Sequence, residues 1–74
     1  MLVVRGPRDV GVWLAERRRE LGMTQHEVAE KARVSRQLLS RVENGSGIRT
    51  EFYKILAISK ALGVEVILSN REAW

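Results

Sequence analysis

Four stretches of the chain place apolar residues at the spacing of an amphipathic helix. The first is expected to begin at Asp9, whose side chain suits an N-cap, and to end near Leu21, where Gly22 can stop a helix. Its apolar stripe consists of Val10, Leu14 and Leu21, with Trp13 at the margin. This stripe is predicted to face the core.

Two shorter helices are predicted next, with a tight turn between them. Thr24 and Glu27 fit a capping box, in which the Thr side chain accepts the Glu backbone N–H and the Glu side chain reaches back. The helix that they start is about two turns long. Ser35 offers a second N-cap, and the helix after it is expected to end at Glu43, before Asn44-Gly45.

A fourth helix is predicted from a cap at Thr50 to a stop at Gly63. The residues expected to share its broad apolar face are Phe52, Ile55, Leu56, Ser59 and Leu62. Beyond Gly63 the apolar period changes from helical to two, which predicts a β-strand over residues 64–69.

A lone strand needs a partner for its backbone hydrogen bonds. It can pair with residues 2–5 or with the same strand of a second copy, and both pairings fit one dimeric sheet. The residues predicted to mediate dimerisation are Val64, Val66, Ile67 and Leu68. The expected fold is therefore mainly α, a four-helix domain with a C-terminal β-strand.

The chain of 74 residues is read as one domain. Residues 1–7 form an arm or short strand, 9–63 the helical core, 64–69 the dimerisation strand and 70–74 a tail. A domain of this size gains stability from disulfides, metals or a partner chain, and a chain with no Cys and one His favours the partner. We expect no cofactor and no metal site. The apolar N-terminal run is too short for a signal peptide, no stretch is long enough for a membrane span, and a cytoplasmic protein is expected.

Charge favours a polyanionic partner. Thirteen Lys and Arg against nine Asp and Glu give a net charge of +4 and a pI near 10.4. Between Ala32 and Thr50, four arginines accompany a single carboxylate, that of Glu43. They are Arg33, Arg36, Arg41 and Arg49. This indicates a one-sided basic surface, although a solvated arginine-rich face has the same composition.

The helix from Ser35 to Glu43 has a polar edge on an apolar base. The base is Leu38, Leu39 and Val42, and the candidate base-contacting residues on the edge are Arg36, Gln37, Ser40 and Arg41. Arg reads guanine, Gln reads adenine, and Ser bonds several base edges. Gln25 and Ser35 begin helices, where backbone N–H groups attract phosphate, although both residues can also be simple caps. Arg49 is a further candidate for phosphate contact.

Several motifs in order resemble the Xre/Cro-type helix-turn-helix family. They are Leu21-Gly22-Met23-Thr24-Gln25, Val28-Ala29, Val34-Ser35, Val42-Glu43-Asn44-Gly45 and Ala61-Leu62-Gly63-Val64, and the resemblance covers about two thirds of the chain. The C-terminal strand, in place of a fifth helix, is most similar to the HipB-type antitoxin branch.

This resemblance implies a repressor that binds a DNA operator as a homodimer and neutralises a HipA-type serine/threonine kinase toxin. It implies a lambda-repressor-like fold and suggests an ion pair between Arg18 and Glu43. The DNA contacts that it implies fall on Gln25, Arg36, Gln37, Ser40 and Arg41, with a phosphate contact on Asn44. Arg33 stands where the family often has Gly. Trp74 is a candidate anchor for the toxin, because interface hot spots favour Trp. The alternatives are a frayed end and packing on its own dimer.

Other functions fit less well. An enzyme is not expected, because the chain has no Cys, no second His and no glycine-rich phosphate loop. A stand-alone repressor without a toxin and a protein-interaction module remain alternatives, although the polar edge lacks the aromatic residues that interface cores prefer. RNA binding is disfavoured because aromatic stacking platforms are missing.

Overall fold

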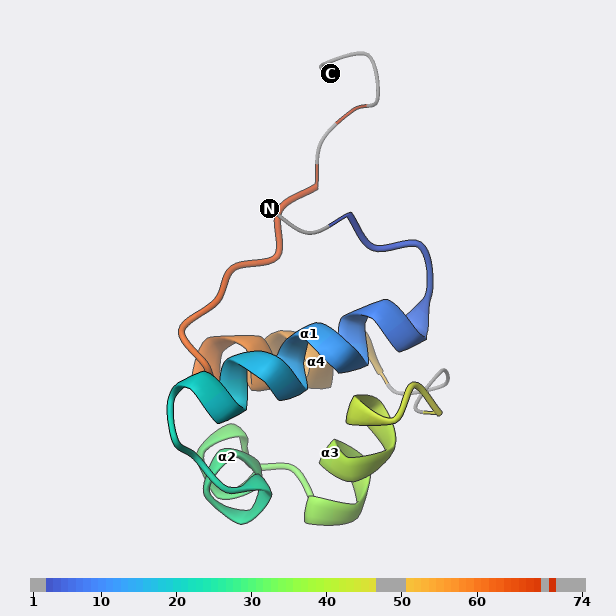
Figure 1. Cartoon of the computed structure of the whole chain (residues 1–74). Coiled ribbons are helices and arrows are strands. Elements are labelled where there is room, and N and C mark those ends of the chain that lie inside the picture. The colour runs from blue at the N-terminus through green and yellow to red at the C-terminus, as the bar shows by residue number, and fades with distance from the viewer. Residues whose placement is uncertain (1–2, 47–50, 69, 71–74) are drawn as a thin grey trace.

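The computed structural model describes residues 3–46, 51–68 and 70. It contains four helices, α1 (Pro7–Glu20), α2 (Gln25–Ala32), α3 (Arg36–Glu43) and α4 (Phe52–Ala61). Helix α1 packs on α3, and α2 packs on both α3 and α4. In Figure 1, α1 lies across the top of the helical part, with α4 behind it in this view and α2 and α3 beneath. The mainly-α, four-helix prediction is confirmed.

The caps of α2 and α3 have the predicted geometry. The Thr24 hydroxyl accepts a hydrogen bond from the backbone N–H of Glu27 at 3.1 Å, and Glu27 Oε1 accepts the Thr24 backbone N–H at 2.9 Å. The Ser35 hydroxyl accepts the Leu38 backbone N–H at 3.0 Å. Each bond satisfies an N–H group that the helix itself leaves without an acceptor, so both helix starts are fixed by local sequence.

Helix α1 begins earlier than predicted. Its N-cap is Gly6 and Pro7 occupies the first turn, where the fixed φ of proline suits a helix and its missing N–H costs nothing. Asp9 lies inside the helix, and its Oδ2 accepts the backbone N–H of Arg5 at 3.0 Å. The prediction of Asp9 as the N-cap is wrong because Gly6-Pro7 already starts the helix.

Left-handed residues end the helices. Gly22 and Gly63 have φ of 68° and 69° and follow α1 and α4, as predicted. At the end of α3, Gly45 adopts φ 76°, whereas Asn44 stays in the right-handed region. The turn between α2 and α3 is made by Arg33 at φ 59°, the only described non-glycine residue with positive φ. The turn expected at this position therefore forms without glycine.

Helix α4 departs from prediction at its start and on its faces. The N-cap is Glu51 with no side-chain cap bond, and Thr50 lies outside the described residues. The side that packs inward carries Ile58, Ser59, Ala61 and Leu62, all buried. Phe52 and Leu56, predicted on the inner face, are exposed. The buried face is centred nearer Ile58 than the apolar pattern indicated.

No β-strand is present among the described residues, so the predicted C-terminal strand is wrong for the single chain. Val64 is half-buried and packs on the core, whereas Val66, Ile67 and Leu68 are exposed. A strand requires a neighbour for its backbone groups, and residues 3–5 do not supply one. Leu2 and Ser69 lie outside the described residues.

The core joins residues from all four helices. Leu14, Val28, Leu39, Ile58 and Leu62 are each at most 2% exposed. Because α3 contributes Leu39 from the middle of its length, the helix is held by the same cluster that stabilises the domain. In the described part of the chain, no helix is long and apolar enough to cross a membrane.

Candidate nucleic-acid interface

Helix α3 has the two-sided arrangement that the sequence predicted. Leu39 and Val42 are buried and Leu38 is half-buried against the core. On the other side, Arg36, Gln37 and Arg41 are exposed and Ser40 is half-buried. The helix therefore presents hydrogen-bonding side chains outward from a fixed apolar base.

A buried ion pair fixes the end of α3. Arg18, from α1, donates from Nε to Glu43 Oε2 at 2.8 Å and from Nη2 to Oε1 at 3.1 Å. The side chains of Arg18 and Glu43 are only 13% and 5% exposed. Two parallel bonds between guanidinium and carboxylate define the relative orientation of both groups. The ion pair that the family resemblance suggested is present.

This pair extends into a network that joins three elements. Arg18 Nη1 donates to the backbone oxygen of Met23 at 3.0 Å, before α2 begins. Gln25 Nε2, in the first turn of α2, donates to Glu43 Oε1 at 2.9 Å. The end of α1, the start of α2 and the end of α3 are thus held together by one carboxylate and its donors.

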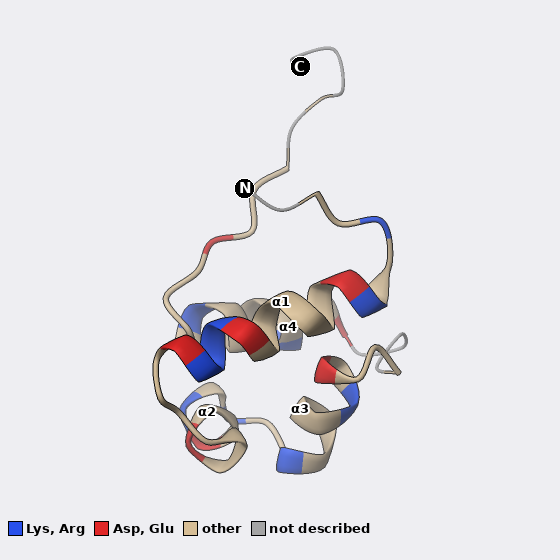
Figure 2. Ribbon diagram, viewed as in Figure 1, with Lys and Arg blue, Asp and Glu red and all other residues tan. Residues whose placement is uncertain are grey.

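The network also shapes the charge of α3. Glu43 is the helix's only acidic residue, and Arg18 neutralises it in the interior. The hydrogen bonds from Arg18 to Glu43 raise the pKa of the Arg18 guanidinium, with a smaller contribution from their charge attraction, so the arginine stays charged. Figure 2 shows basic positions along α3, with the acidic position at its end. The exposed side of α3 therefore carries positive charge only.

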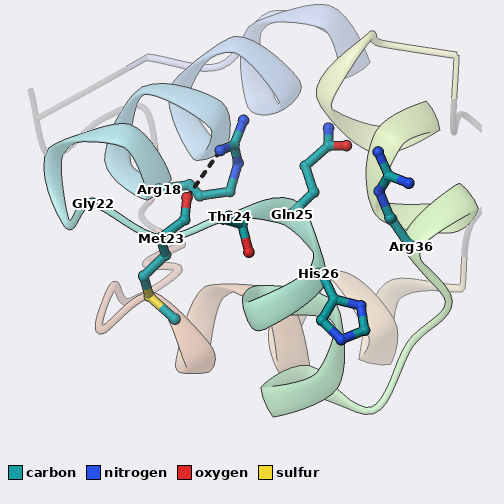
Figure 3. Close-up of a pocket in the computed structure, with 7 residues that line it drawn as sticks. All are labelled: Arg18, Gly22, Met23, Thr24, Gln25, His26 and Arg36. Atoms are coloured by element: carbon teal, nitrogen blue, oxygen red, sulfur yellow. Dashed lines mark hydrogen bonds between the residues drawn. The ribbon is translucent and has the colours of Figure 1, made fainter.

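An open hollow of about 530 Å³ lies at the starts of α2 and α3. Gln25 and Arg36 extend toward it from the first turns of the two helices, and Arg18 lies on the other side of Gln25 from Arg36 (Figure 3). The remaining lining residues are Gly22, Met23, Thr24 and His26. Helix starts present backbone N–H groups and the positive end of the helix dipole, so the hollow suits an anionic group.

The structure places the other predicted phosphate contacts less uniformly. Ser35 uses its hydroxyl as the α3 cap, and Asn44 is exposed directly after α3. Gln25 shares its amide nitrogen with Glu43, which leaves that nitrogen one further N–H to donate. Arg49 and Trp74 lie outside the described residues. Across the ranges that the structure describes, no group of His and acidic residues is arranged to hold a metal ion.

Close backbone contact between α1 and α3 was not predicted from the sequence. A Cβ atom added to Gly11 would lie 2.8 Å from the Glu43 backbone oxygen and closer still to that of Val42. A Cβ atom added to Gly45 would likewise lie 2.8 Å from the Cα of Arg8. A glycine inside the α1 apolar pattern was the available signal, because such a glycine often marks a close approach of backbones.

Comparisons with known proteins agree with this geometry. Two solved structures share the fold, each with a TM-score of 0.85 and 21% sequence identity over 96% of this chain. One is a HipB variant in complex with an O2 20-mer, of which 97% is covered, and the other is HipB in complex with an O4 20-mer, of which 99% is covered. No curated protein sequence matches the chain. A family model described as helix-turn-helix matches residues 14–68, from α1 through the segment after α4. The chain therefore belongs to the helix-turn-helix family.

Proposed function

We propose that this protein is a sequence-specific regulator that binds double-stranded DNA, with α3 in the major groove. The observation that carries the proposal is the exposed row of Arg36, Gln37 and Arg41 on a helix whose other side and whose end are both buried. A recognition helix needs base-reading side chains on a rigid support, and α3 has both.

Each exposed side chain of α3 has a proposed role. Arg36 and Arg41 pair with guanine O6 and N7, Gln37 pairs with adenine N6 and N7, and Ser40 bonds a neighbouring base edge. Phosphate contacts are assigned to Gln25, Ser35, Asn44 and Arg49. The hollow beside Gln25 and Arg36 supports this assignment, because it joins one residue of each class.

The protein is proposed to act as a homodimer of one domain, residues 1–74. Two recognition helices of a dimer enter successive major grooves about 34 Å apart on a two-fold symmetric operator. Val66, Ile67 and Leu68 are 44%, 76% and 88% exposed. These residues, with Val64 at the base of their segment, are proposed to contact the second copy.

The HipB-like fold supports a more specific role as an antitoxin. On this proposal the dimer occupies its operator, blocks transcription, and also neutralises a HipA-type serine/threonine kinase, with Trp74 as a candidate anchor. Co-expression with a kinase encoded beside this gene tests the role: a stable complex and loss of kinase toxicity support it. The absence of any such neighbour and of any kinase in pull-downs from the native cell would leave a stand-alone repressor.

DNA binding is tested by fluorescence anisotropy on a duplex selected from a random pool, with a scrambled duplex of equal length as control. The logarithm of affinity is expected to fall linearly with the logarithm of salt concentration for both duplexes, because phosphate contacts release counterions. Only the selected duplex retains tight binding near physiological salt. Equal affinity for both duplexes, or affinity independent of salt, would refute the proposal.

A further inference from the structure

His26 lines the hollow between the starts of α2 and α3, but none of the proposed DNA contacts uses it. It is the second residue of α2, directly after Gln25, and Arg36 lies across from it on α3 (Figure 3). Its side chain is 76% exposed, and it is the only histidine in the chain. Histidine is the side chain whose charge ordinarily changes between pH 5 and 8, so a change of charge in this hollow near neutral pH falls to His26.

Charged groups of both signs surround His26. On its own helix, Glu27 is the next residue and Glu30 Oε2 lies 3.4 Å from His26 Nε2. From the other two helices that border the hollow, α3 contributes Arg36 and α1 contributes Arg18. Two carboxylates and two guanidinium groups leave neither sign dominant around the ring. A phosphate in the hollow adds a negative charge, and a nearby negative charge favours the charged form of histidine.

The contact with Glu30 leaves His26 available to a phosphate. Both side chains are 76% exposed, and an ion pair as exposed as this one contributes little stability. Glu30 also lies one turn further along α2, away from the helix start where backbone N–H groups attract an anion. The ring can therefore exchange this carboxylate for a phosphate oxygen at little cost. A charged imidazole then donates an N–H bond to an anion, which is a strong class of hydrogen bond.

We propose that His26 contacts a DNA phosphate in its charged form, so that the affinity of this protein for DNA rises as the pH falls through the neutral range. The inference rests on the proposed function, because it adds a pH-dependent contact to the same interface. The sign follows from linkage: a phosphate that favours charged His26 is bound more tightly when His26 is protonated, and binding at intermediate pH takes up a proton.

The test measures the affinity of the full chain for its selected duplex at fixed salt, at about pH 8 and about pH 5.5, with folding checked by circular dichroism. The natural chain is expected to bind about two- to five-fold more tightly at the lower pH for each bound copy of His26, the range typical of an exposed ion pair. His26→Gln is expected to lose this increase, and His26→Lys, which stays charged, is expected to bind equally at both pH values. The α-amino group and the carboxylates titrate in all three proteins, so the difference between them reports His26.

Salt dependence and proton uptake distinguish a phosphate contact from an indirect effect on the fold. The slope of log affinity against log salt is expected to steepen at the lower pH by about 0.9 for each bound copy of His26, because each phosphate contact releases counterions. Calorimetry in two buffers of different ionisation enthalpy is expected to show proton uptake on binding by the natural chain and less by His26→Gln. A rise in affinity with an unchanged slope would overturn the assignment of His26 to a phosphate.

The same titrations separate this inference from the proposed function. If the natural chain binds its selected duplex but its affinity changes with pH no more than that of His26→Gln, the inference is wrong and the proposed function stands. If no selected duplex is bound at either pH, the proposed function fails, and the inference fails with it.

Discussion

The buried carboxylate of Glu43 gives the sharpest prediction for stability. Glu43→Gln keeps the size of the side chain but removes the charge that Arg18 meets at 2.8 Å in an environment where the two side chains are 13% and 5% exposed. Removing one partner of a buried pair costs about 3–5 kcal/mol, since the remaining charge stays buried. For a chain of this length the whole free energy of unfolding is about 4–11 kcal/mol. We therefore expect a loss of about 3 kcal/mol and a large fall in Tm.

Urea denaturation followed by circular dichroism measures this loss through the shift of the midpoint at constant m-value. Glu20→Gln is the matched control. Glu20 pairs with Arg17 at 3.5 Å but is 66% exposed, so this change is expected to cost under about 0.5 kcal/mol. A loss below about 1 kcal/mol for Glu43→Gln would refute the reasoning that the network is a buried, charge-dependent support of α3.

A double variant separates charge from packing. Arg18→Met combined with Glu43→Leu removes both charges together, and apolar replacement of a buried pair is often neutral or stabilising. We expect it to recover at least half of the stability lost in Glu43→Gln. The double variant also removes the acceptor of Gln25 Nε2, so the affinity of the protein for the DNA phosphates is expected to fall while its stability recovers. Recovery of both properties would contradict a role of Glu43 in orienting Gln25.

Three further predictions concern local features. The Thr24 backbone N–H, and then the Thr24 hydroxyl, lower the pKa of Glu27, so the capping box stabilises α2 at pH values above the unfolded pKa of about 4.3. This stabilisation is lost as the pH falls through the lower pKa of the folded state. The NMR chemical shift of the Thr24 amide should report the titration, and Glu27→Gln should abolish it. Arg33→Gly should raise the free energy of unfolding by about 0.5–1 kcal/mol, because glycine adopts the left-handed conformation without the steric cost that Arg33 bears there. The urea midpoint should therefore rise, and a lowered midpoint would contradict this. Gly11→Ala should lower the free energy of unfolding by about 2 kcal/mol, because the added Cβ clashes with the backbone at the end of α3. Gly6→Ala is the mild control, because a Cβ at Gly6 meets nothing within 4 Å. Equal effects of the two changes would argue against close packing of α1 and α3.

Local signals predicted much of the fold. The capping residues Thr24 and Ser35 act within three residues of their partners, so the sequence alone identifies both helix starts. The stops at Gly22 and Gly63 follow from the conformational freedom of glycine. The outward edge of α3 follows from helical periodicity. These features depend on neighbours along the chain, and the structure confirms them.

Features that depend on distant contacts were harder to predict. The bond from Gln25 to Glu43 joins residues eighteen positions apart, and no local pattern indicates it. The buried face of α4 is set by how the helix meets α2, so Leu56 was placed wrongly on the inner side. The strand over residues 64–69 was predicted from alternation alone, although a strand forms only where another segment pairs with it.

The most direct test of DNA recognition is the base preference of Arg36→Ala. Selection from a random duplex pool defines the preferred site, and affinities are then measured for every single-base change in one half-site. Arg36→Ala is expected to lose about 1–3 kcal/mol on the preferred site and to relax discrimination at one position only, whereas Arg19→Ala, the same change at an exposed residue of α1, keeps the full preference. Unchanged base preference in Arg36→Ala, or equal weakening on all duplexes, would contradict the assignment of α3 as the recognition helix.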